Sequence, residues 1–197
     1  MTLDRFRPYV GGLLDPAIRI SVRLGITPNV YSIGALVAAF AAGVAFYEGQ
    51  IGLAVLFVAI NAVFDAIDGA LARELKVASL RGDFIDHVSD RYADIVIITG
   101  IFAGGAASWE IGVFALTGVL MSSYMGTQAQ ALGVGRYYGG VLGRADRLVL
   151  ILLAGLLDLI VAAPIFGLPY LGWILVFFGV FGHYTALQRI AYIWRRI

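Results

Sequence analysis

The chain has 197 residues, of which 60% are hydrophobic and only 14% are charged, and its formal net charge is +1. This composition excludes a soluble domain, in which apolar residues make up about half of the chain, and predicts a polytopic membrane protein. The small net charge gives no reason to expect nucleic acid as a partner, and the lack of cysteine excludes disulfides and thiolate chemistry.

The N-terminal segment, residues 3–23, is expected to form an amphipathic helix in the membrane interface. Apolar side chains alternate with arginines along it, and Pro8 and Pro16 interrupt the run. Because charges occur throughout the first 25 residues, the segment does not read as a cleavable signal peptide. An ordinary charged leader is the alternative interpretation.

Hydropathy then predicts six membrane-spanning helices, each near the roughly 20 residues that cross a bilayer. We place them at about 27–47, 51–73, 83–104, 109–131, 147–163 and 169–192. The predicted fold class is therefore an all-α integral membrane protein, with six transmembrane helices plus the N-terminal interfacial helix. Residues 1–197 form a single transmembrane domain in this interpretation.

The basic residues predict the orientation of these helices. All 14 Lys and Arg residues fall at the termini or near the second and fourth connections, on one side of the six-helix arrangement. The opposite connections carry only Glu48, Glu110 and Asp158 as charges. By the positive-inside rule, both termini and the acidic cluster described next face the cytoplasm.

Four aspartates lie close together at the second connection. Asp65 and Asp68 are three residues apart, and Asp86 and Asp90 are four apart, so each pair occupies one face of its helix. Carboxylates facing one another would repel unless cations lie between them, and ionised groups near membrane depth usually mark function. This pattern predicts a divalent-metal site; a structural set of ion pairs with nearby arginines is the alternative.

The full pattern is Asp65-x2-Asp68-Gly69-x2-Ala72-Arg73-x8-Gly82-x3-Asp86-x3-Asp90. It resembles the signature of the CDP-alcohol phosphotransferases, D-x2-D-G-x2-A-R-x8-G-x3-D-x3-D, at every signature position. The predicted helices and the interfacial segment extend this resemblance over essentially the whole chain.

The resemblance implies roles for individual residues. Asp65, Asp68 and Asp86 would be the main ligands of Mg²⁺ or Mn²⁺, with two ions per site, and Asp90 would be the general base and contact the second metal. The CDP part of the donor would be bound by residues of the signature, of the second connection and of the first spanning helix. These are Asp68, Gly69, Ala72, Arg73, Ser79 and Gly82, together with Asn29, Val30, Tyr31 and Ser32. Residues 29–32 also fit an ordinary helix start after Thr27 and Pro28.

The acceptor is less well defined than the donor. The layout from Thr117 to Leu150 looks like the enzymes that make phosphatidylinositol phosphate or its archaeal counterpart, but residues 125–130 lack the expected basic residue. Three arginines on the predicted cytoplasmic side, Arg136, Arg144 and Arg147, can bind an acceptor phosphate. Equally, they can serve topology and contact anionic lipid headgroups.

These observations predict a phospholipid synthase that transfers a phosphatidyl-type or archaetidyl-type group from a CDP-activated lipid to a small polar acceptor, releasing CMP. A phosphopolyol such as inositol phosphate or glycerol phosphate is the favoured acceptor, and the resemblance suggests a homodimer in the cell membrane. The alternatives are a divalent-cation transporter that uses the acidic cluster, and a family member with a CDP-linked soluble polyol as donor.

Overall fold

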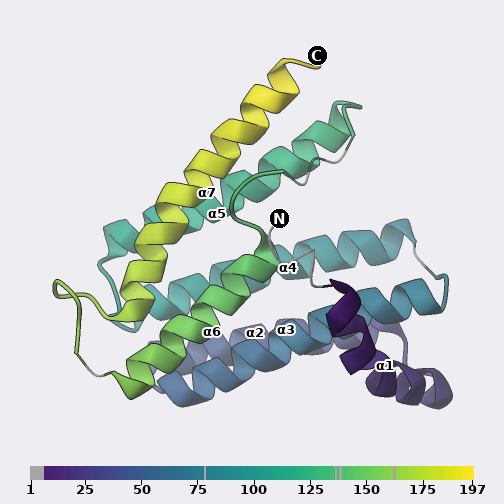
Figure 1. Ribbon diagram of the computed structural model, residues 1–197, viewed down its shortest axis with the longest axis horizontal. Coiled ribbons are helices and arrows are strands. Elements are labelled where there is room, and N and C mark those ends of the chain that lie inside the picture. Colours follow the sequence, from purple (N-terminus) through teal and green to yellow (C-terminus); the bar gives the residue numbers. More distant parts are fainter. Residues whose placement is uncertain (1–6, 78, 136, 138, 162) are drawn as a thin grey trace.

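The computed structural model describes residues 7–77, 79–135, 137, 139–161 and 163–197, and the described chain is helical throughout (Figure 1). No strand occurs among these residues, which confirms the all-α prediction. The helices are α1 (Arg7–Leu24), α2 (Pro28–Tyr47), α3 (Ile51–Glu74), α4 (Leu80–Ala103), α5 (Trp109–Ala131), α6 (Arg144–Ile160) and α7 (Tyr170–Trp194).

Two helices begin earlier than the hydropathy pattern predicts, because polar side chains cap them. The Ser79 hydroxyl accepts a hydrogen bond from the backbone N–H of Gly82 at 3.1 Å, so α4 begins at Leu80 rather than at 83. Likewise, the Asp146 carboxylate accepts from the N–H of Gly143 at 3.0 Å, and α6 runs from Arg144 to Ile160 rather than from 147 to 163.

Three helices of the described chain, α2, α3 and α7, are long and apolar enough to cross a membrane. Helix α4 carries a row of aspartates and arginines in its first half, which lowers its hydropathy. Helix α6 has only 17 residues. Three helices with the length and hydropathy of membrane spans thus lie next to helices whose charge or length sets them apart.

The helices form two groups, seen in Figure 1 as the lower layer and the oblique pair above it. Helix α2 packs along both α3 and α4, α5 packs along α7, and α6 contacts both groups through α3 and α7. Small residues permit the closest approaches: a Cβ on Gly100 of α4 would lie 2.2 Å from the carbonyl oxygen of Gly43 in α2. Glycine at this crossing lets the two backbones touch, as is common between membrane helices.

The connection from α3 to α4 is short, so the end of α3 and the start of α4 lie at the same end of the molecule. Helix α6 begins close to them, since Arg144 contacts Asp65 of α3 and Asp90 of α4. The fold therefore gathers the charged segments of three helices in one region.

Candidate functional site

Three of the four signature aspartates meet between α3 and α4. One carboxylate oxygen from each of Asp65, Asp68 and Asp86 lies within 4.8 Å of the other two. Asp65 and Asp86 are partly exposed, whereas Asp68 is 6% exposed. The spacing of three residues in α3 places both of its carboxylates toward α4, as the helical periodicity predicts.

Helix α2 adds a serine hydroxyl beside this group of carboxylates. The Ser32 hydroxyl donates a hydrogen bond to Asp68 Oδ2 at 2.7 Å, and both side chains are buried. Ser32 was selected from sequence as a donor contact, and the structure places it directly against a proposed metal ligand. One turn before Asp65, the fully buried Asn61 anchors α3 to α2 by donating to the carbonyl oxygen of Ala35 at 2.8 Å.

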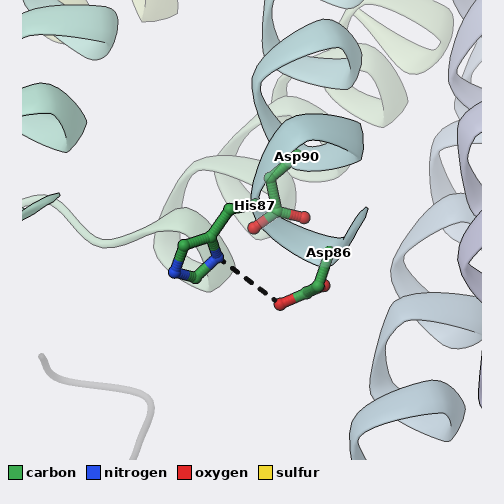
Figure 2. A group of neighbouring side chains, drawn as sticks. All are labelled: Asp86, His87 and Asp90. Atoms are coloured by element: carbon green, nitrogen blue, oxygen red, sulfur yellow. Dashed lines mark ion pairs between the residues drawn. The ribbon is translucent and has the colours of Figure 1, made fainter. Parts of the chain in front are cut away.

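Asp90 lies one turn after Asp86, in a second group that includes His87 (Figure 2). Ligand atoms of these three side chains lie within 4.8 Å of one another, and His87 Nδ1 is 3.8 Å from Asp86 Oδ2. The sequence periodicity turns His87 away from the Asp86–Asp90 face, which predicts a lipid- or interface-facing role in preference to metal ligation. In the structure the imidazole lies near the carboxylates of Asp86 and Asp90, and its Nε2 is 3.8 Å from Asp83 Oδ1.

Arg144 joins the two groups. Its Nη1 forms ion pairs with Asp65 Oδ1 and with Asp90 Oδ1, so one guanidinium bridges α3 and α4. Arg144 was predicted only as an acceptor contact; the structure adds contacts to a proposed ligand and to the proposed base.

Asp94 and Arg147 form a buried pair one turn farther along α4. Arg147 Nη2 donates to Asp94 Oδ2 at 2.7 Å, and the two residues are 3% and 6% exposed. Arg91 Nη2 lies 3.4 Å from the same Asp94 oxygen and 3.7 Å from Asp90 Oδ2. A charge this deeply buried requires such partners.

The remaining donor residues of the signature lie around the end of α3 and the start of α4. A Cβ on Gly69 would meet only the end of the Arg73 side chain, at 3.4 Å, so open space adjoins this glycine. Arg73 and Ser79 are exposed, and Ala72 and Gly82 are partly buried. Open space beside an exposed guanidinium suits the approach of a phosphate-bearing group.

The segment at the start of α2 divides into two faces. Tyr31 and Ser32 point into the protein: the Tyr31 hydroxyl is 2.6 Å from Ser21 Oγ in α1, and Ser32 contacts Asp68. Asn29 and Val30 are exposed. Helix α2 begins at Pro28 after Thr27, whose side chain makes no capping hydrogen bond.

A cavity of about 390 Å³ adjoins the aspartates on the side of α5 and α7. Asp90 and Arg144 belong to its wall as well as to the aspartate site. Three further arginines line it, namely Arg91, Arg147 and Arg189, together with the hydroxyl-bearing residues Ser122, Ser123, Tyr124, Thr127 and Tyr137. The predicted acceptor residue Arg136 lies outside the described residues.

Sequence reasoning assigned Arg189 to the basic C-terminus and missed its place in this cavity. From α7 it donates to the carbonyl oxygens of Gly139 at 2.9 Å and of Ser122 at 2.5 Å. Its Nη1 lies 3.0 Å from the position of a Cβ on Gly126, so the guanidinium packs against the stretch 125–130 that lacks a basic residue. An ionisable residue inside a predicted span was the available signal.

The residues between α3 and α4 fit a hard divalent cation. Carboxylate oxygens are the ligands that Mg²⁺ and Mn²⁺ prefer, and the side chains of Asp65, Asp68 and Asp86 already converge.

Comparisons with known proteins agree with this geometry. The chain is 31% identical to the archaetidylinositol phosphate synthase of Methanothermobacter thermautotrophicus, over 99% of this chain and 95% of that protein. It superimposes on the crystal structure of Mycobacterium tuberculosis phosphatidylinositol phosphate synthase with CDP-DAG bound, with a TM-score of 0.78 and 26% identity, covering 91% of this chain and 92% of the other.

A second structure of that mycobacterial enzyme, in complex with manganese and citrate, gives a TM-score of 0.79 at 26% identity and covers 91% of this chain and 88% of the other. Residues 25–184 match the family model described as CDP-alcohol phosphatidyltransferase. That range includes every residue of the aspartate signature, from Asp65 to Asp90. The chain belongs to the CDP-alcohol phosphatidyltransferase family.

Proposed function

We propose that the protein transfers a phosphatidyl-type or archaetidyl-type group from a CDP-activated lipid to a hydroxyl of a phosphorylated polyol such as inositol phosphate, releasing CMP. The observation that carries this proposal is the shared wall of two sites. Asp90 and Arg144 belong both to the aspartate site between α3 and α4 and to the arginine-lined cavity beside it. A donor diphosphate and an anionic acceptor would therefore meet at Asp90.

The donor side uses the signature residues. Asp65, Asp68 and Asp86, with Asp90 at a second ion, would hold two Mg²⁺ or Mn²⁺ ions. When bound, these ions neutralise the diphosphate and stabilise the leaving CMP. Ser32 fixes the Asp68 carboxylate by its hydrogen bond, while the open space at Gly69 and the exposed Arg73 receive the cytidine phosphates.

The transfer step needs one proton acceptor at the attacking hydroxyl. Asp90 takes this proton, and the acceptor oxygen forms a bond to the β-phosphorus of the CDP-lipid. The bond from that phosphorus to the CMP oxygen breaks, so a phosphodiester and CMP result. Asp90 is 14% exposed and lies on the cavity wall, where an acceptor hydroxyl can reach it.

The cavity suits an acceptor that carries a phosphate. The side chains of Arg91, Arg144 and Arg147 line its wall, and guanidinium N–H groups donate well to anion oxygens. Arg189 supplies a further cation beside residues 125–130. Relatives of this chain are archaetidylinositol phosphate and phosphatidylinositol phosphate synthases, and citrate, a polyanion, is present in one solved relative.

The membrane arrangement belongs to the same proposal. Helices α2 to α7 form six spans, α1 lies in the interface, and both termini and the active site face the cytoplasm, where CDP-lipid headgroups and soluble phosphopolyols are accessible. The protein acts as a homodimer in the cell membrane. The distribution of the 14 Lys and Arg residues supports this orientation.

A panel of acceptors tests the function directly. Purified protein with Mn²⁺ or Mg²⁺ and a CDP-lipid, in ester and in ether form, is incubated with inositol phosphate, glycerol phosphate, inositol, glycerol or serine, and CMP release is measured. We expect release with a phosphorylated polyol and loss of release in EDTA. Release only with the unphosphorylated acceptors would contradict the proposed acceptor class. CDP-inositol with a lipid acceptor tests the reversed donor arrangement, and ion flux into proteoliposomes without CDP-lipid tests a transporter.

A further inference from the structure

We propose that Asp94 is a positioning residue for the acceptor. It holds the guanidinium groups of Arg91 and Arg147 at the wall of the cavity, where the anionic group of the acceptor binds. This inference rests on the proposed function and adds to it a residue outside the family signature.

The contacts of Asp94 suit this role. Its Oδ2 accepts a hydrogen bond from Arg147 Nη2 at 2.7 Å and lies 3.4 Å from Arg91 Nη2, so one carboxylate oxygen serves two arginines. Both arginines line the cavity, but Asp94 does not. With 6% of its surface exposed, Asp94 therefore lies behind them, away from the space that a ligand would fill.

Electrostatics explains why such a residue is needed. Two guanidinium groups close together repel each other, and Arg147 is only 3% exposed, so solvent does little to stabilise its charge. A shared carboxylate offsets the repulsion and fixes both side chains. Both arginines that Asp94 joins line the cavity, which points to a role in binding and not in stability alone.

The spacing of residues along α4 sets the distance between the bound acceptor anion and the proposed base, Asp90. Asp86, Asp90 and Asp94 are spaced by four residues, and each such step advances about 6 Å along an α-helix. Arg91 spans one of these steps, with its Nη2 3.7 Å from Asp90 Oδ2 and 3.4 Å from Asp94 Oδ2. The acceptor anion would thus bind about one helical turn from the attacking hydroxyl, which favours phosphorylated over unphosphorylated polyols.

The test uses the full-length protein with Asp94→Asn, which keeps the size of the side chain and removes its charge. Initial rates give kcat and KM for inositol phosphate and for the CDP-lipid, and calorimetric titration measures binding of inositol phosphate without the donor. We expect KM and Kd for inositol phosphate to rise about tenfold or more, and KM for the CDP-lipid to stay within about twofold. Asp94→Glu, which restores the charge, should recover part of the affinity.

Asp158→Asn is the matched control. Asp158 is a hydrogen-bond acceptor like Asp94: it accepts from the backbone N–H groups of Tyr170 at 2.7 Å and Leu171 at 2.9 Å, but it caps α7 and does not line the cavity. This variant should lower the thermal stability and leave KM for inositol phosphate unchanged.

The outcomes separate the two proposals. Wild-type protein that releases no CMP with any acceptor would overturn the proposed function. Unchanged affinity for inositol phosphate in Asp94→Asn, with only stability or kcat reduced, would overturn the role of Asp94. If Asp94→Asn does not fold, Asp94→Ser is measured in its place, and unchanged affinity for inositol phosphate in that neutral variant overturns the role in the same way. A wild-type protein that binds no inositol phosphate overturns it as well.

Discussion

The aspartates of α3 and α4 differ in the groups that neutralise them. Asp68 accepts a hydrogen bond from the neutral Ser32 hydroxyl, whereas Asp65 and Asp90 share the charged Arg144. Asp94 is matched with Arg147 at 2.7 Å. The aspartates thus have more positively charged partners toward the arginine-lined cavity than at the proposed metal site. A site rich in carboxylates suits the metal ions that a diphosphate donor needs, and a site rich in arginines suits an anionic acceptor.

Asp90 is the residue whose loss should most affect chemistry rather than binding. We expect Asp90→Asn to reduce CMP release by about 10²-fold to 10⁴-fold, because the amide cannot take the proton of the attacking hydroxyl. The affinity for Mn²⁺, measured by electron paramagnetic resonance, should fall by a smaller factor than the rate of CMP release, since Asp65, Asp68 and Asp86 remain.

The matched control is Asp83→Asn, on the same helix but outside the signature. Asp83 lies in the first turn of α4, where a carboxylate stabilises the helix dipole. This variant should keep its rate of CMP release. Normal turnover of Asp90→Asn would remove Asp90 as the base.

Substitution of Gly69 should weaken donor binding without lowering the stability of the protein. Alanine is better than glycine inside a helix by about 1 kcal/mol, and a Cβ at this position would meet only Arg73 Nη1, at 3.4 Å. Gly69→Ala should therefore keep or raise the thermal stability, while KM for the CDP-lipid rises about tenfold because the methyl group fills the donor's space. Unchanged KM would show that the nucleotide does not approach this backbone.

The pairing of helices is controlled by small residues at the crossings. Helices α2 and α4 meet at Gly43 and Gly100, and α5 and α7 meet at Gly118 and Gly182, where a Cβ on Gly182 would lie 2.6 Å from the Gly118 backbone. In lipid, helices associate through such close packing and not through burial of apolar surface from water. The Gly43–Gly100 crossing sets the separation of α2 and α4, and so the distance between Ser32 and Asp86.

Gly100→Ala tests this at the α2–α4 crossing. A Cβ there would lie 2.2 Å from the carbonyl oxygen of Gly43, so the helices must move apart, at a cost of about 1–3 kcal/mol. We expect a lower midpoint of thermal unfolding in detergent and reduced activity. Gly12→Ala in α1 is the control, because no atom lies within 4 Å of its Cβ position. Equal stability of both variants would contradict the packing argument.

The whole molecule places its charged site at one end of the helices. The α3–α4 connection and the start of α6 lie there, and the proposed orientation makes this end cytoplasmic. The chain has no cysteine, so single cysteines can report on each side without background.

Val77→Cys, in the α3–α4 connection, should react with a membrane-impermeant maleimide only after cells are permeabilised. Gln50→Cys, in the α2–α3 connection, should react in intact cells. Both native side chains are exposed, so burial does not hide either position. Labelling of Val77→Cys in intact cells would reverse the orientation and place the active site outside.

Much of the architecture followed from local sequence. Apolar runs marked α2 to α7 within a few residues, because helices in a membrane must satisfy their own backbone hydrogen bonds and so form independently of their partners. The errors lay at the starts of α4 and α6, where the side chains of Ser79 and Asp146 extend the helices into charged sequence that hydropathy excludes. The spacing of Asp65, Asp68, Asp86 and Asp90 likewise predicted their convergence, since helical periodicity fixes which residues share a face.

By itself, then, the sequence determined the helical class and the aspartate signature, because both depend on spacing within one helix or one connection. Only the tertiary structure decided the partners across helices: the bridge from Arg144 to Asp65 and Asp90, the Asp94–Arg147 pair and the entry of Arg189 into the cavity. The contacts of these three arginines join residues 50 to 79 positions apart, and no local pattern encodes the packing of helices that brings them together.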